Sequence, residues 1–354
     1  MTTPDRDRLL ELDVLRGIAA LAVVLFHYTF RYQELYGYAV APDFVMTYGF
    51  LGVEFFFCIS GFVIFMTLDR TRRPMDFVVS RASRLWPAYI AAMILTYCAV
   101  HLCALPGRAT TFGQALVNLT MFQELLHVPH VDAAYWSLQV ELIFYCWMFA
   151  AYLGGMLARI RALLCLGLVP PLVYFVAHRY FHHDLSFLAE TFLLVQYIPY
   201  FTIGIAAYNL RTNRDHPRRD LLLMAAAVAV TAICLTPPEC ATALIAAIVF
   251  YAAARGRLKW IARGPLVFLG TISYTLYLIH QNIGYIVIRT AIGHGIPTDL
   301  AICMAVGVAI GLAAVLTWTV ERPARNWLRN VYKRHRSRRE AAARRPQGMP
   351  ATGI

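Results

Sequence analysis

The chain is dominated by apolar runs that reach the length a helix needs to cross a bilayer. About 20 apolar residues, each rising about 1.5 Å, span the hydrocarbon core. Such runs recur from residue 12 to residue 321 and leave no polar stretch long enough for a soluble domain. Of all residues, 59% are hydrophobic and 15% charged, against about 45–50% and about 25% in soluble proteins. The sequence therefore predicts an all-α, multi-pass membrane protein and argues against a soluble enzyme or a disordered chain.

The apolar runs predict ten transmembrane helices. Their expected ranges are 12–30, 48–68, 84–104, 137–157, 162–179, 188–209, 220–236, 239–254, 266–288 and 299–321. The seventh and eighth are short, and only the turn at 236–239 separates them. Pro170 and Pro171 predict a kink in the fifth, because proline cannot continue the hydrogen bonding of a helix interior.

The basic residues are divided very unequally between the two sides of this arrangement. With ten spans, the outer side receives only four of the 32 Lys and Arg residues, namely Arg31, Arg108, Arg179 and Arg289. Cytoplasmic loops carry the excess of Lys and Arg, so both termini are expected in the cytoplasm. The net charge of +12 then reflects orientation in the membrane and does not indicate a nucleic-acid partner. We expect residues 1–330 to form one membrane-embedded domain. Residues 331–354 are expected to be a basic cytoplasmic tail, lying along headgroups or disordered.

Two ionisable residues share a face of the first predicted helix. Arg16 and His27 are eleven residues apart, which is three turns plus about 20° and an axial rise of about 16 Å. Arg16 lies at the inner boundary and His27 past the middle of the membrane. Ionisable groups in a span are costly and therefore candidates for function. The alternative is that Arg16 reaches the headgroups and His27 is a hydrogen-bonded core residue.

Further ionisable residues lie near the ends of other spans. Arg81 and Arg84, one helical turn apart at the inner end of the third span, suit a phosphate-bearing ligand, although they also serve as orientation charges. Glu141 lies in the fourth span at a depth similar to that of His27. His280 lies in the outer half of the ninth span. We expect His27, Glu141 and His280 to form one layer, in which the carboxylate orients an imidazole.

The remaining candidates carry weaker signals. Glu54 enters the second span from the outer side and is either a structural ion-pair partner or part of a site. Gly61 permits close approach of another helix. Trp136 is an interfacial aromatic residue at the start of the fourth span. His130 and Asp132 fall in an outer loop and are expected to be solvated, with no strong metal-ligand pattern.

Taken together and in this order, these segments resemble the acyltransferase 3 family of integral membrane O-acyltransferases. The similarity extends from Leu12 to about Trp327. It rests on several motifs: Arg16 and His27 with ten residues between them, the GVEFFFCISGF stretch, Arg81 and Arg84 followed by Pro87, the segment from Trp136 to Glu141, and the segment from Ser273 to His280.

The resemblance implies an enzyme that takes an acyl group, most often acetyl, from cytoplasmic acyl-CoA and passes it to a hydroxyl on the outer side. The acceptor in such a family is commonly a cell-surface or lipid-linked glycan, in the inner membrane of a bacterium. By resemblance His27 is the catalytic residue, acting as a base or itself becoming acylated, and no metal is expected. The resemblance also implies that Arg16, Arg81 and Arg84 hold the donor. From their positions, we expect Glu141 to orient His27 or hold the acceptor, and His280 and Tyr145 to bind the acceptor or stabilise the tetrahedral oxyanion. Glu54 and Trp136 are further candidates for binding the acceptor.

Other functions remain open at this level. The acceptor can instead be a small molecule such as a macrolide, or the donor succinyl-CoA. A transporter or flippase of lipid-linked sugars would use the buried Glu and His residues as a proton relay. The sequence has no inverted repeat that would support a transporter.

Overall fold

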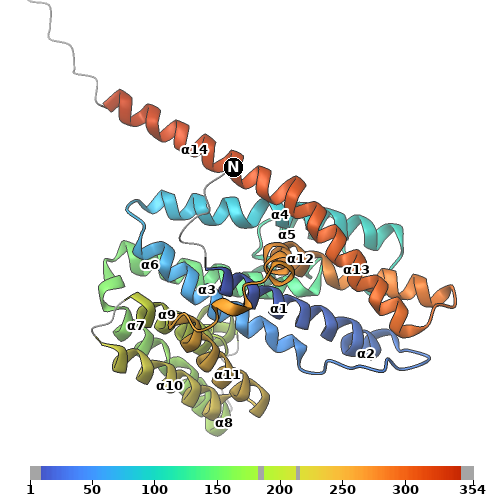
Figure 1. Cartoon of the computed structure of the whole chain (residues 1–354), viewed down its shortest axis with the longest axis horizontal. Helices are drawn as coiled ribbons and strands as arrows, with labels where there is room; N and C mark the ends of the chain where they lie inside the picture. Colours follow the sequence, from blue (N-terminus) through green and yellow to red (C-terminus); the bar gives the residue numbers. More distant parts are fainter. Residues whose placement is uncertain (1–8, 182–186, 213–215, 344–354) are drawn as a thin grey trace, which may run out of the picture.

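The computed structural model describes residues 9–181, 187–212 and 216–343, and these residues form helices and turns without any β-strand. The predicted all-helical class is therefore confirmed. The α-helices (Figure 1) are α1 (Leu10–Phe26), α2 (Tyr32–Tyr36), α3 (Gly52–Asp69), α4 (Pro74–Leu102), α5 (Phe112–Asn118), α6 (Trp136–Leu153), α7 (Ile160–Gly167), α8 (Val169–Phe181), α9 (Ile198–Thr212), α10 (Pro217–Cys234), α11 (Pro237–Ala254), α12 (Gly264–Gly293), α13 (Thr298–Leu316) and α14 (Arg322–Ala343). Wider π-helical turns occupy His27–Arg31, Phe187–Phe192 and Thr317–Glu321.

Helices lie at each of the ten predicted spans, but they are not equally suited to cross a membrane. Five helical segments in the described part of the chain are long and apolar enough: Gly49–Asp69, Pro74–Leu102, Met156–Tyr180, Pro237–Ala254 and Thr298–Arg338. The helices at the other predicted spans do not meet both requirements; α9, for example, has only 15 residues. The chain is thus a helical membrane protein, whereas ten crossings and cytoplasmic termini stay predictions.

The fifth predicted span is broken where the sequence indicated a kink. Helix α7 ends at Gly167 and α8 begins at Val169, so Pro170 and Pro171 fall in the first turn of α8. Proline is tolerated there because the first N–H groups of a helix have no partner within the helix. The two prolines therefore place the break between these helices.

Small residues let the central helices cross at close range. Helix α1 packs against α12 and α3, and α3 packs against α9 (Figure 1). A Cβ on Gly17 would lie 2.6 Å from the backbone nitrogen of Gly270, and one on Gly61 would lie 2.3 Å from the carbonyl oxygen of Phe201. The close approach predicted at Gly61 is confirmed. Because Gly17 follows Arg16 directly, the crossing of α1 and α12 also fixes Arg16 beside α12.

The expected disorder of the basic tail is not found in its first part. Helix α14 runs without a break at residue 330 as far as Ala343, and the last eleven residues lie outside the described part of the chain. The Tyr332 hydroxyl donates to Asp76 Oδ1 at 2.8 Å, and Arg336 pairs with the same oxygen at 3.4 Å. Composition suggested a segment that lies along headgroups or is disordered, whereas these contacts to α4 give its polar side chains partners within the protein.

Candidate active site

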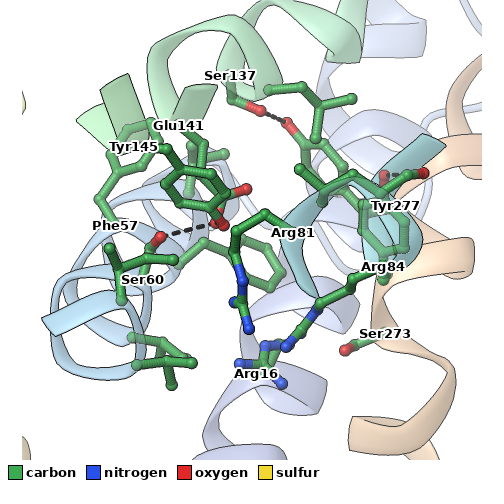
Figure 2. Close-up of a pocket in the computed structure, with 18 residues that line it drawn as sticks. Arg16, Phe57, Ser60, Arg81, Arg84, Ser137, Glu141, Tyr145, Ser273 and Tyr277 are labelled. Carbon is green, nitrogen blue, oxygen red and sulfur yellow. Dashed lines mark hydrogen bonds between the residues drawn. The ribbon is translucent and has the colours of Figure 1, made fainter. Parts of the chain in front are cut away.

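Three arginines converge on one pocket between α1, α3, α4, α6 and α12. The pocket encloses about 650 Å³ including its open mouth. We call it the arginine pocket (Figure 2). Its polar lining consists of Arg16 from α1, Ser60 from α3, Arg81 and Arg84 from α4, Ser137, Glu141 and Tyr145 from α6, and Ser273, Tyr274 and Tyr277 from α12. The structure therefore brings together the three arginines that the sequence analysis assigned to the donor.

The guanidinium groups in this pocket have few partners. Arg16 Nη1 pairs with Asp13 Oδ1 at 3.2 Å. Arg81 Nη2 donates to Ser80 Oγ at 3.2 Å, while its buried Nε has no hydrogen-bond partner among the described residues. Arg84 makes no hydrogen bond or ion pair with any residue that the structure describes, and its guanidinium points toward that of Arg16 (Figure 2). Clustered cations with free donors favour an anionic ligand, and arginine matches phosphate in shape.

Glu141 belongs to the arginine pocket. Its Oε1 accepts hydrogen bonds from the Ser60 hydroxyl at 2.7 Å and the Tyr145 hydroxyl at 2.5 Å (Figure 2). His27 does not line this pocket. Among the described residues, no hydrogen bond or ion pair joins Glu141 to His27 or His280, so Glu141 does not orient an imidazole in this structure as we expected. The depth of each residue can be predicted by counting along its helix, whereas the direction that a side chain faces depends on how α6 packs against the other helices.

His27 is paired instead with His280 from α12. His280 Nε2 lies 3.2 Å from His27 Nδ1, and the rings are 4.8 Å apart at 76°. His27 Nδ1 also lies 2.8 Å from the carbonyl oxygen of Val23, and His280 Nδ1 lies 2.7 Å from that of Tyr277. His280 is fully buried. We refer to His27 and His280 as the histidine pair.

The hydrogen bonds of the histidine pair indicate which ring nitrogens carry a hydrogen. A carbonyl oxygen only accepts, so the Nδ1 atom of His280 carries a hydrogen and its Nε2 atom in the neutral ring is an acceptor. The Nδ1 atom of His27 likewise carries a hydrogen, which faces both Val23 O and His280 Nε2. The Nε2 atom of His27 therefore keeps its lone pair, which is the form needed for a base or a nucleophile.

A wide helical turn begins at His27. The chain leaves the regular geometry of α1 there and forms the π-helical segment His27–Arg31. Within it, the Tyr28 hydroxyl donates to the carbonyl oxygen of His280 at 2.7 Å. The ring of Tyr28 lies against Gly284, where a Cβ would collide with it. Single π-turns within α-helices often occur at functional sites. The segment thus joins α1 to α12 at the level of the histidine pair.

Sequence reasoning missed the role of Asp132, which was expected to be solvated. Its side chain is buried, Oδ1 accepts from the Ala134 N–H at 3.0 Å, and Oδ2 accepts from the Asn282 N–H at 3.1 Å. Burial raises the pKa of Asp132 to about 6. The loop that carries Asp132 is thereby fixed to α12 two residues after His280. The one available signal was an Asp directly before a short helix, a preferred capping position.

The residues expected to hold the acceptor do not gather at one place. Tyr145 lines the arginine pocket and His280 belongs to the histidine pair. Trp136 packs near the ring of Phe57 with centroids 6.4 Å apart, outside the pocket. Glu54 is buried, its Oε2 has no hydrogen-bond partner among the described residues, and it also lies outside the pocket. Neither Glu54 nor Trp136 therefore lines the arginine pocket, although Trp136 contacts Phe57, which does.

Tyr277 borders both centres. Its side chain lines the arginine pocket, and its hydroxyl lies 2.6 Å from Ser137 Oγ and donates to the carbonyl oxygen of Ala134 at 2.9 Å. Its ring centroid lies 5.6 Å from that of His280, and its carbonyl oxygen accepts from His280 Nδ1. One residue of α12 thus stands between the cationic pocket and the imidazole groups.

The fold and the site define an integral membrane protein that places a cationic pocket close to a buried pair of histidines. The chain belongs to the acyltransferase 3 family, because the family's model, described as an acyltransferase domain, matches residues 9–319. The protein is accordingly a membrane acyltransferase. No curated protein and no solved structure matches the chain significantly.

Proposed function

We propose that the protein is an O-acyltransferase of the bacterial inner membrane, which moves an acyl group, most often acetyl, from cytoplasmic acyl-CoA to a hydroxyl of a cell-surface or lipid-linked glycan. One observation carries this proposal: Arg84, with no partner among the described residues, lies with Arg16 and Arg81 in one pocket. His27 is eleven residues, or about 16 Å, farther along the same helix as Arg16.

The donor would enter from the inner side. Its phosphates are too strongly charged to cross the bilayer, and the three arginines offer charge-assisted hydrogen bonds to hold them. The uncharged pantetheine arm would then extend along α1, past Tyr277, and carry the thioester toward His27. Binding energy from the phosphates thereby positions a reacting group that lies far from them.

The acyl transfer would use the free nitrogen of His27. The acceptor hydroxyl gives its proton to His27 Nε2 while its oxygen attacks the thioester carbonyl. The tetrahedral intermediate expels the CoA thiolate, which takes the proton back from His27, so the products are an ester and free CoA. His280 is a positioning residue in this scheme because it accepts from His27 Nδ1. A route through acylated His27 would use the same nitrogen, and acid quenching during turnover would trap the acyl-imidazole.

The test of the function is transfer of label in isolated membranes. Membranes that contain the protein should incorporate [14C]acetyl from acetyl-CoA into glycan as an ester that alkali releases. Membranes without the protein serve as the control. Movement of a lipid-linked sugar without covalent labelling would favour the transporter class. Faster transfer with succinyl-CoA, or to a macrolide, would replace the proposed donor or acceptor.

His280 provides a test of the positioning role. We expect His280→Ala to lower kcat by about 10- to 100-fold, while KM for acetyl-CoA stays unchanged. This loss is a part of the rate enhancement of about 10²- to 10⁴-fold that a general base contributes. His280→Gln, whose amide oxygen can accept from His27 Nδ1, should recover part of the rate. The matched control is His294→Ala, which removes an exposed histidine from the end of α12. A His280→Ala enzyme with the wild-type kcat and the same pH profile would contradict the assignment.

A further inference from the structure

Helix α14 brings one more arginine to the edge of the arginine pocket. Arg329 Nη2 donates to Ser80 Oγ at 3.2 Å, and Arg81 Nη2 donates to the same oxygen at 3.2 Å. Because Arg81 lines the pocket, a single shared hydroxyl connects Arg329 to it. Helix α14 packs along the first half of α4 and extends beyond the bundle (Figure 1). It also lies beyond residues 9–319, which the family model matches.

The charge of Arg329 is not neutralised by a carboxylate. Glu321 pairs with Arg325 at 3.4 Å, and Asp76 pairs with Arg336 at 3.4 Å. Within the described ranges Arg329 makes no ion pair, and its partner, the Ser80 hydroxyl, carries only a partial negative charge. The carboxylates around it are thus already engaged with other arginines.

Further cations surround this partly buried arginine. The charges of Arg325 and Arg84 act on Arg329, and Arg329 in turn acts on Arg81. Like charges held close together repel, most strongly where water is partly excluded. Of these cations, only Arg325 forms an ion pair with a carboxylate in the described ranges. A cluster with such an excess of positive charge is suited to a ligand that carries several negative charges itself.

We propose that Arg329 binds the phosphate on the 3′-oxygen of the donor's adenosine, while Arg16, Arg81 and Arg84 bind its pyrophosphate. This inference rests on the proposed function, since it assumes an acyl-CoA donor. Coenzyme A carries both groups on one nucleoside, so its two phosphate sites must be adjacent, as Arg81 and Arg329 are across Ser80. The planar guanidinium of arginine can bind a phosphate through two hydrogen bonds. Arg329 would therefore discriminate coenzyme A from 3′-dephospho-coenzyme A.

The experiment compares the binding of these two compounds to the full-length protein in phosphatidylcholine nanodiscs. The wild type should bind coenzyme A about 10- to 100-fold more tightly than 3′-dephospho-coenzyme A, as expected for one charge-assisted contact. Arg329→Gln should remove this preference by raising Kd for coenzyme A alone. The matched control is Arg336→Gln, which removes the same charge from α14 at a residue already paired with Asp76, and it should keep the preference.

The outcomes separate this inference from the proposed function. A wild type that binds both compounds equally overturns the inference and leaves the function intact, whereas one that binds neither removes the function and the inference with it. A phospholipid phosphate at Arg329 would leave the preference unchanged in Arg329→Gln, which also overturns the inference. Arg329→Lys distinguishes a lost contact from a folding defect. It keeps the positive charge, so it should retain a reduced preference for coenzyme A over 3′-dephospho-coenzyme A. The full wild-type preference in both variants would contradict the proposal.

Discussion

Replacing His27 by alanine is expected to abolish acyl transfer, lowering kcat by at least about 10²- to 10⁴-fold, the usual contribution of a general base. The physical reason lies in the hydrogen bonds of the histidine pair. They involve Nδ1 of His27, so Nε2 of His27 keeps a lone pair that is free to accept a proton. Release of free CoA from acetyl-CoA, followed with a thiol reagent in the presence of the membrane acceptor, measures the loss.

A matched control exists for this substitution. His101, near the end of α4, also places Nδ1 2.8 Å from the carbonyl oxygen four residues before it, but it is exposed. His101→Ala should therefore transfer acetyl at the wild-type rate. Unchanged elution of the His27→Ala protein in size-exclusion chromatography and unchanged acyl-CoA binding would establish that it is folded. Turnover near the wild-type rate in that variant would remove His27 from the mechanism.

Replacing Arg84 by alanine is expected to weaken acetyl-CoA binding by about 10- to 100-fold. Its guanidinium has no partner among the described residues and points into the arginine pocket, so it is available to the donor (Figure 2). Arg81→Ala should act in the same direction. Because Arg84 is assigned to the pyrophosphate, its loss should weaken coenzyme A and 3′-dephospho-coenzyme A alike, unlike the loss of Arg329. Equilibrium binding to the purified protein measures both Kd values.

The control for Arg84 is an arginine outside the arginine pocket. Arg289 is exposed near the C-terminal end of α12, and Arg289→Ala should leave acyl-CoA binding unchanged. Arg84→Lys keeps the charge but loses the planar fork, so it should bind with an intermediate Kd. Wild-type affinity in both Arg81→Ala and Arg84→Ala would exclude a role for this pair in holding the donor.

The relation between Arg16 and His27 illustrates what can be read from a sequence of this kind. Their spacing along one helix predicts a common face, and both side chains do turn toward α12. Arg16 lines the pocket to which Ser273 of α12 also belongs, and His27 lies against His280. Glu141 illustrates the opposite case. Its depth resembled that of His27, yet it faces Ser60 and Tyr145 in the arginine pocket. Depth follows from counting residues, whereas direction depends on the rotation of each helix against its neighbours.

The surroundings of Asp132 and Arg329 were not predicted, for a related reason. Both occur in polar stretches whose composition indicates solvent, and both obtain their surroundings from residues distant in the sequence. Asp132 is buried because the N–H of Asn282 in α12 meets its carboxylate. Arg329 is fixed next to Ser80 because α14 continues in the direction of α13 and packs along α4.

The sequence by itself determined the helical membrane class and indicated the ionisable residues proposed for the site, because apolar length and the cost of burying charge are local properties of a chain. The tertiary structure alone decided which of those residues meet: the three arginines with Glu141, and His27 with His280. Such pairings arise from helix crossings set by small residues such as Gly17 and Gly270, whose contacts join positions more than 250 residues apart.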